Sequence, residues 1–253
     1  MKAYDYSKVA KDYDLVELGG GEGPMTSELI HKILKKYKVK TVLDMTCGTG
    51  AQSIGLTKKK YKVLASDISK DMLAIAKRKA KEKKLKIIFK QGDIRTAKYG
   101  KFDAVIAMFN AIGHLTKKDF DKAIKNVKEN LKEKGIFIFD IFNLDYMKKN
   151  FIKHEFIDTA KEYNGFKFVR FNKNKMNVKK GLLHINQKTF MQRGNSPFQM
   201  RKEKGWDMQI YSVSELKPLL EKNGFKILQI LDYTGKKFEK NKSNFILMVA
   251  RKK

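Results

Sequence analysis

A glycine-rich turn that follows a short apolar segment constrains this 253-residue chain more than any other feature. The segment Val42-Leu-Asp-Met-Thr-Cys-Gly-Thr-Gly50 enters the turn, and seventeen residues after Gly50 the segment Val63-Leu-Ala-Ser-Asp67 ends in an acid. In a parallel α/β sheet, such glycines let the backbone approach a nucleotide-like ligand closely, and the acid accepts hydrogen bonds from ribose hydroxyls. The pattern therefore predicts a site for a nucleoside-bearing cofactor.

Strand-like and helix-like segments alternate around this turn. Ser69 is the expected N-cap of one of the helices. The apolar periodicity predicts helices over residues 25–37, 51–58, 70–83 and 117–132, and strands over residues 41–45, 62–66, 86–89, 102–108 and 135–141. Alternation of this kind predicts a parallel, doubly wound sheet with its loops gathered on one edge.

The pattern changes after Asn143. Strand-like runs at residues 166–171, 182–190 and 206–211 are separated by polar turns, which predicts antiparallel strands. A helix over residues 214–222, capped by Ser212 or Ser214, and strands over residues 225–232 and 244–250 close the chain. Because the segment that joins these two strands is short, we expect them to pair antiparallel.

Charge and composition exclude some classes of protein. The formal net charge is +29, but the lysines are scattered, and arginine, which binds bases and phosphates better, occurs at only six positions. Nucleic-acid binding is therefore an alternative rather than the favoured interpretation, since the charge can also reflect compositional bias. Cys47 is the only cysteine, which excludes a disulfide framework and a cysteine-based zinc site.

The chain carries no targeting or membrane signal in its sequence. Its first residues are polar and contain no apolar core of a signal peptide, and no apolar run is long enough to span a bilayer. We therefore expect a cytoplasmic protein without a membrane partner, and we expect no metal site.

The turn and the segments after it carry five motifs in order. A dinucleotide fingerprint requires a third glycine where this chain has Ser53, whereas Asp44-x-Thr46-x-Gly48-x-Gly50 resembles the first motif of class I S-adenosylmethionine-dependent methyltransferases. Four later segments resemble the later motifs of that family in order. The second motif is matched by Asp67-Ile68 with Met72-Leu73, and the third by Gly92-Asp93-Ile94. The fourth is matched by the strand that ends in Met108-Phe109, and the fifth by the segment around Gly135.

The resemblance implies S-adenosyl-L-methionine as cofactor and assigns residues to it. Asp67 is expected on the ribose, Met72 near the adenine, Asp93 on the adenine amino group, and Met108 on the methionine part. The N-terminal Tyr-Asp segment, with Tyr13, is expected to lie over the cofactor. The full expected set is Tyr13, Asp44, Thr46, Gly48, Gly50, Asp67, Ile68, Met72, Asp93, Ile94, Met108 and Phe109.

The same resemblance implies an architecture. We expect a Rossmann-like, doubly wound seven-stranded sheet with a closing antiparallel strand, and a β-rich insertion before the last helix. The expected division is an N-terminal lid and helix at residues 1–40, a cofactor-binding domain at residues 41–150 with 213–253, and an antiparallel insertion at residues 151–212 that covers the substrate.

Residues 108–115 form the segment where acceptor and cofactor are expected to meet. The segment resembles small-molecule N-methyltransferases, with Asn110 matching a residue of glycine N-methyltransferases and His114 one of amino-sugar N,N-dimethyltransferases. Asn110 and His114 are the expected catalytic residues, although His114 as a base and His114 as a packing residue both stay open. Phe142 stands where the glycine enzymes have an arginine for the substrate carboxylate, which disfavours glycine as acceptor.

Three functions follow as hypotheses. The main one is methyl transfer to a small molecule, at nitrogen. The second is an RNA methyltransferase recruited by the basic surface, and the third is a cofactor-binding regulator without transfer activity. An Asp/Asn-Pro-Pro-Tyr/Phe motif is absent after the fourth strand, which disfavours transfer to exocyclic base amines, and the lack of a second cysteine excludes a cysteine adduct at pyrimidine carbon-5.

Overall fold

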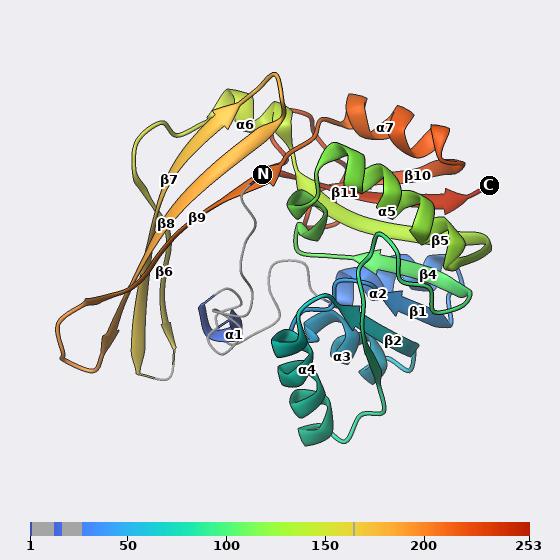
Figure 1. Ribbon diagram of the computed structural model, residues 1–253, viewed down its shortest axis with the longest axis horizontal. Helices are drawn as coiled ribbons and strands as arrows, with labels where there is room; N and C mark the ends of the chain where they lie inside the picture. The colour runs from blue at the N-terminus through green and yellow to red at the C-terminus, as the bar shows by residue number, and fades with distance from the viewer. Residues whose placement is uncertain (2–12, 17–26, 164) are drawn as a thin grey trace.

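The computed structural model describes residues 1, 13–16, 27–163 and 165–253, and contains two β-sheets (Figure 1). The larger sheet has seven strands in the order β10-β11-β5-β4-β1-β2-β3, of which β11 pairs antiparallel with both β10 and β5. Its strands are β1 (Thr41–Asp44), β2 (Lys62–Asp67), β3 (Ile88–Gln91), β4 (Phe102–Ala107), β5 (Leu131–Phe142), β10 (Phe225–Leu231) and β11 (Phe245–Lys252). The doubly wound sheet and its closing antiparallel strand are confirmed.

Helices cover both faces of this sheet. The described helices are α1 (Tyr13–Val16), α2 (Ser27–Lys36), α3 (Ala51–Lys58), α4 (Lys70–Glu82), α5 (Lys117–Glu129), α6 (Leu144–Asn150) and α7 (Val213–Lys222), with a 3₁₀ turn η2 (Ala111–His114), and α6 packs against the second sheet rather than the first. Apolar residues of α5 and α7 pack with Leu43 and Phe137 on one face, and those of α2 and α3 pack with Val42 and Ile136 on the other. The buried middle parts of the central strands are therefore mainly apolar, as expected for parallel strands buried on both faces, and the acids Asp44 and Asp67 lie at strand ends.

The second sheet is antiparallel, in the order β6-β7-β8-β9, and stands to the side of the first in Figure 1. Its strands are β6 (Phe156–Tyr163), β7 (Phe166–Asn177), β8 (Leu182–Arg193) and β9 (Gln199–Gln209). One face of it carries Leu183, Ile185, Trp206 and Met208, which form a buried cluster with Leu144 at the start of α6. The β-rich insertion before the last helix is thus confirmed, and it is attached to the core through an apolar contact.

Several element boundaries differ from the predicted ones. The helix predicted over residues 117–132 ends at Glu129, because the side chain of Asn130 accepts a hydrogen bond from the Tyr99 amide and donates to two carbonyls, and Leu131 already pairs with Phe102. Strand β6 and helix α6 were not predicted. Residues 25 and 26 of the predicted first helix lie outside the described residues.

Caps fix the helices around the site. Ser69 accepts a hydrogen bond from the Met72 amide at 3.3 Å, as predicted, and Ser212 forms a capping box with Glu215 at the start of α7. In the part of the chain that the structure describes, no helix is long and apolar enough to cross a membrane.

Candidate functional site

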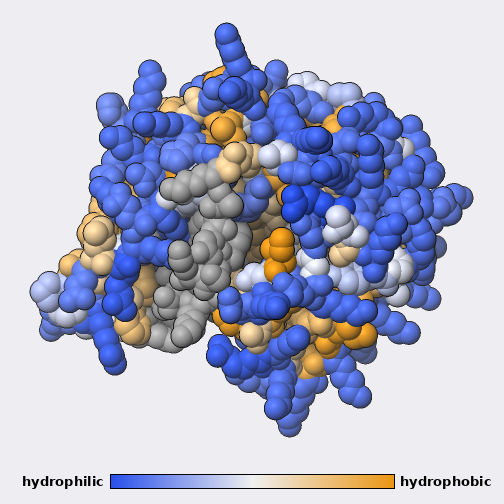
Figure 2. All heavy atoms as spheres, in the orientation of Figure 1, coloured by the Kyte–Doolittle hydropathy of each residue, from blue (hydrophilic) through white to orange (hydrophobic). Residues whose placement is uncertain are grey.

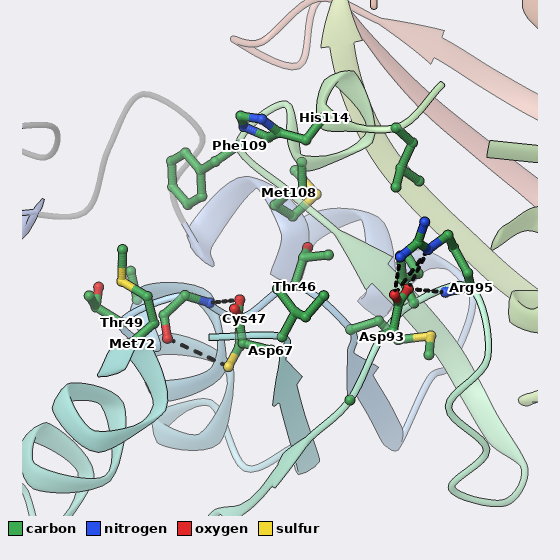
Figure 3. A pocket seen from close by; sticks show the side chains of 18 of the residues that line it. Thr46, Cys47, Thr49, Asp67, Met72, Asp93, Arg95, Met108, Phe109 and His114 are labelled. Atoms are coloured by element: carbon green, nitrogen blue, oxygen red, sulfur yellow. Dashed lines mark hydrogen bonds and ion pairs between the residues drawn. The ribbon is translucent and has the colours of Figure 1, made fainter. Parts of the chain in front are cut away.

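A cavity of about 380 Å³ lies where β1, β2, β3 and β4 end (Figure 3). Because β1 lies between β2 and β4, this edge is the point at which the strand order reverses, and α/β sheets bind ligands there. Eleven of the fourteen predicted site residues line it, namely Tyr13, Thr46, Gly48, Asp67, Ile68, Met72, Asp93, Ile94, Met108, Phe109 and His114. The structure thus brings together residues that are up to a hundred positions apart in the sequence.

The glycine turn forms one wall of the cavity. Gly48 and Gly50 have φ angles of 52° and 86°, a left-handed conformation that favours glycine. The Gly50 amide donates to the Cys47 carbonyl at 2.8 Å, and a Cβ atom on Gly50 would lie 3.1 Å from Cβ of Ala76 in α4. The turn therefore needs glycine at position 50 for backbone conformation and for space.

Asp67 closes the turn from the end of β2. One of its carboxylate oxygens accepts a hydrogen bond from the Gly48 amide at 2.8 Å, and the other accepts one from the Ser69 amide at 2.9 Å. Burial raises the pKa of Asp67, and these amide donors oppose the shift. Next to Asp67, the Ile68 side chain is 59% exposed and also lines the cavity, an apolar surface against which a flat ring can pack.

Asp93 lies on the far wall and is held by a residue that was not predicted. The Arg95 Nε atom is 2.9 Å from each carboxylate oxygen of Asp93, and this hydrogen bonding lowers the pKa of Asp93 (Figure 3). Arg95 itself lines the cavity and lies 3.6 Å from Asp119. Its position directly after the third motif, two residues after Asp93, was the only sequence signal for it.

Helix α1 is tied to the cavity through Asp14. The Asp14 carboxylate accepts a hydrogen bond from Thr49 in the glycine turn and forms a 2.7 Å ion pair with Lys79 of α4. Tyr13, the neighbour of Asp14, therefore lies at the cavity as predicted, but Asp14 and Thr49 were missed. Residues Met45, Cys47, Ala51, Gly92, Ala111 and Leu115 also line the cavity and were not predicted, although each is adjacent to a motif residue or to the turn after β4.

Two of the predicted binding residues stand behind the cavity wall. Asp44 is buried and accepts a hydrogen bond from the Ser53 hydroxyl at 2.6 Å; burial raises the pKa of Asp44 to about 7. Gly50 begins α3 and does not line the cavity. By contrast, the Thr46 hydroxyl oxygen is buried at the cavity and has no hydrogen-bond partner among the described residues. Such an orphaned group indicates a place for a polar ligand atom.

The turn after β4 brings Phe109 and His114 to the cavity. Asn110 itself does not line the cavity: its side-chain oxygen accepts a hydrogen bond from the Phe142 amide at 3.1 Å, and its amide nitrogen is 3.4 Å from the sulfur of Met208. The predicted catalytic Asn110 is therefore placed to hold the turn. Desolvation lowers the pKa of His114 to about 4, so the imidazole is neutral at neutral pH.

No group of three or more His, Cys, Asp or Glu side chains that could hold a metal ion occurs among residues 13–16, 27–163 and 165–253.

Residues 42–135 match a family model described as a methyltransferase domain. Glycine/sarcosine N-methyltransferase of Parasynechococcus marenigrum is 37% identical over 118 residues, which are 45% of this chain and 42% of that protein. The dTDP-3-amino-3,4,6-trideoxy-alpha-D-glucopyranose N,N-dimethyltransferase of Streptomyces venezuelae is 30% identical over 135 residues, 51% of this chain and 54% of that protein. The matches thus span about half of these relatives' length or less.

The fold as a whole also has a solved counterpart. The crystal structure of an S-adenosylmethionine-dependent methyltransferase from Clostridium acetobutylicum matches with a TM-score of 0.79 and 23% identity, and the alignment covers 98% of each chain. At this identity the likeness establishes the common fold, second sheet included.

Proposed function

We propose, from the premise that residues 42–135 are a methyltransferase domain, that this chain transfers a methyl group from S-adenosyl-L-methionine to a nitrogen of a small molecule. The observation that carries the proposal is that the glycine turn, Asp67, Asp93 and the turn after β4 all line the same cavity. The named activities of the two relatives, one on glycine and sarcosine and one on an amino sugar, support nitrogen as the acceptor atom.

The residues at the cavity fit the cofactor. The Asp67 carboxylate suits the ribose hydroxyls, and the exposed Ile68 side chain suits an adenine face. Thr46 offers a hydroxyl that has no partner among the residues that the structure describes. S-adenosyl-L-methionine supplies a methyl group on a sulfonium, which needs alignment with the acceptor more than activation. The sequence pattern predicts that Asp93 accepts a hydrogen bond from the adenine amino group. Because Arg95 already donates to both carboxylate oxygens of Asp93, fewer acceptor positions remain for that amino group.

Because the His114 ring is neutral at neutral pH, its role in the methyl transfer is limited to hydrogen bonding. With a pKa of about 4, the imidazole is a weak base, but a neutral ring nitrogen accepts a hydrogen bond from an amine N–H. We therefore assign His114 the orientation of the acceptor amine, and we assign loss of the ammonium proton to water.

Replacing His114 tests this assignment. His114→Asn is expected to lower kcat/KM for the amine acceptor by about tenfold, less than the roughly hundredfold or more that general-base catalysis contributes. The pH profile between 6 and 9 should keep its shape, as a titrating His114 does not cause it. The exposed His154→Asn is the control, and a loss above about a hundredfold would restore His114 as the base.

The second sheet offers a polar surface for the acceptor. Asn172 of β7 and Gln187 of β8 pair directly across the strands and are only 7% and 4% exposed. Within the described part of the chain, their side-chain oxygens have no hydrogen-bond partner. By strand alternation they share the face of Ile185 and Leu183, and Leu183 pairs with Met208, which contacts Asn110 in the turn. Two buried acceptors on this face favour an acceptor molecule that carries hydrogen-bond donors.

The double variant Asn172→Leu with Gln187→Leu should raise the KM of the acceptor by about tenfold or more, from lost hydrogen bonds of about 1 kcal/mol each. Cofactor affinity should stay the same and the melting temperature should not fall, because the replaced oxygens have no hydrogen-bond partner among the described residues. Asn186→Leu, on the opposite face of β8, is the matched control. An unchanged KM would remove this face from the acceptor site.

Methyl transfer to fractionated metabolites, RNA and protein tests the proposal directly. With tritiated S-adenosyl-L-methionine, label is expected in the small-molecule amine fraction. The net charge of +29 and the largely hydrophilic face in Figure 2 are what favour the RNA alternative. Label found only in RNA, together with RNA affinity that falls steeply with salt, would establish that alternative instead. Tight cofactor binding with no label in any fraction would indicate a regulator.

A further inference from the structure

A buried carboxylate lies under the turn after β4. Asp140 of β5 is 1% exposed and shares its face of the sheet with Ile136 and Ile138, while Leu247 of β11 pairs beside it. Burial in these surroundings raises the pKa of Asp140 to about 7. A carboxyl group among aliphatic side chains destabilises the fold unless its hydrogen bonds offset the desolvation, so its presence there calls for an explanation.

Asp140 binds the two most strained residues of the site. Its Oδ2 atom accepts a hydrogen bond from the Asn110 amide at 2.8 Å, and the neighbouring Phe109 amide also acts to lower the pKa of the carboxyl group, whereas the Oδ1 atom has no hydrogen-bond partner among the described residues. Phe109 and Asn110 have φ angles of 61° and 55°, and a left-handed residue other than glycine costs about 1–3 kcal/mol. Two successive amides in such a conformation form a concave site for an anionic oxygen.

The side chain of Asn110 provides a second link between the turn and β5. Its side-chain oxygen accepts a hydrogen bond from the amide of Phe142, two residues after Asp140, so the turn and β5 are linked in both directions. On the side that faces the second sheet, a Cβ atom on Gly113 would lie 2.9 Å from the side-chain nitrogen of Asn110 and 2.9 Å from the methyl carbon of Met208. The turn therefore lies between β5 and the second sheet, packed closely enough at Gly113 to leave no space for a side chain, and it presents Phe109 and His114 to the cavity.

We propose that Asp140 is a positioning residue whose carboxylate holds residues 109–114 in the left-handed turn and thereby places Phe109 and His114 at the methyl-transfer site. The structural argument stands on the hydrogen bonds, and its catalytic meaning rests on the proposed function. A side chain that only filled the core would be apolar here, since leucine occupies similar space without desolvating a charge. The carboxylate is retained because the buried backbone amide of Asn110 in the turn needs an acceptor.

The ring of His114 reports whether the turn is held. We would follow the imidazole C2–H signals of the full-length, cofactor-free protein by NMR from pH 3 to pH 9 in the wild type, Asp140→Leu and Asp140→Asn. His114→Asn assigns the His114 signal, and His31, His154 and His184 are internal controls. In Asp140→Leu the released ring should gain water, and the pKa of His114 should rise by about one unit or more from about 4 toward its ordinary 6.5.

Asp140→Asn keeps one carbonyl oxygen that can accept the hydrogen bond from the turn. It should therefore shift the pKa of His114 by less than Asp140→Leu does. A role of Asp140 in packing alone does not predict this difference between the two variants. Circular dichroism establishes which variants are folded. A folded Asp140→Leu protein in which His114 titrates as in the wild type would overturn the proposal. If Asp140→Leu does not fold, Asp140→Ala, which is smaller and also lacks an acceptor, replaces it: an upward shift in the pKa of His114 supports the proposal, and an unchanged titration overturns it. Because neither cofactor nor acceptor is present, failure here is distinct from failure of the proposed methyl transfer.

Discussion

Asp67→Ala is expected to weaken binding of S-adenosyl-L-methionine by about a hundredfold, measured by isothermal titration calorimetry. Two charge-assisted hydrogen bonds to ribose hydroxyls at about 1.5 kcal/mol each give about 3 kcal/mol, or roughly two orders of magnitude in Kd. The substitution also removes the acceptor for the Gly48 amide, which lies 2.8 Å from the carboxylate and fixes the glycine turn. Both effects act on the cofactor and neither depends on the identity of the methyl acceptor.

Asp71→Ala is the matched control for this experiment. Asp71 is exposed in the first turn of α4, four residues from Asp67, and should change Kd by less than about twofold. Since burial raises the pKa of Asp67, wild-type affinity should fall as the pH is lowered toward that pKa, whereas Asp67→Ala should lack this dependence. An Asp67→Ala protein with wild-type affinity would show that the ribose assignment is wrong.

The motif residues could be located from the sequence because they follow the ends of parallel strands. Asp67 and Met108 lie at such ends, and the topology alone brings those ends to one edge of the sheet. What the pattern could not specify is the direction of each side chain. Asp44 is the last residue of β1, yet it points to the Ser53 hydroxyl behind the turn, and Asn110 points to β5.

Contacts between distant segments explain the rest of what was missed. The bond from Asn110 to Asp140 joins residues thirty positions apart in different elements, and Asp14 reaches Thr49 and Lys79 across α3 and β2. Neither contact leaves a local spacing that a motif can record. The strands of the second sheet are longer than predicted for a related reason: β7 runs on to Asn177 through polar residues that are typical of a loop, and pairing with β8 keeps them extended.

Gly50→Val should lower the free energy of unfolding by about 3 kcal/mol, which corresponds to a drop in Tm of about 6–12 °C for a chain of this size. A β-branched residue at a φ of 86° is strained by about 1–3 kcal/mol, and its Cβ atom would meet Cβ of Ala76 at 3.1 Å. The contact matters because it lies where the glycine turn packs against α4, next to the amide that Asp67 binds. Thermal unfolding followed by circular dichroism gives the measurement.

Gly194→Val separates backbone strain from this contact. Gly194 also has a left-handed φ, 53°, but it lies in an exposed turn between β8 and β9 where a Cβ atom would have nothing within 4 Å. Strain alone should then cost Gly194→Val about 1–2 kcal/mol, less than the cost at Gly50. The difference between the two variants measures how tightly the glycine turn is packed against Ala76 of α4 beside the cavity. Equal losses would mean that Ala76 moves away without cost, and that position 50 requires glycine for its backbone conformation only.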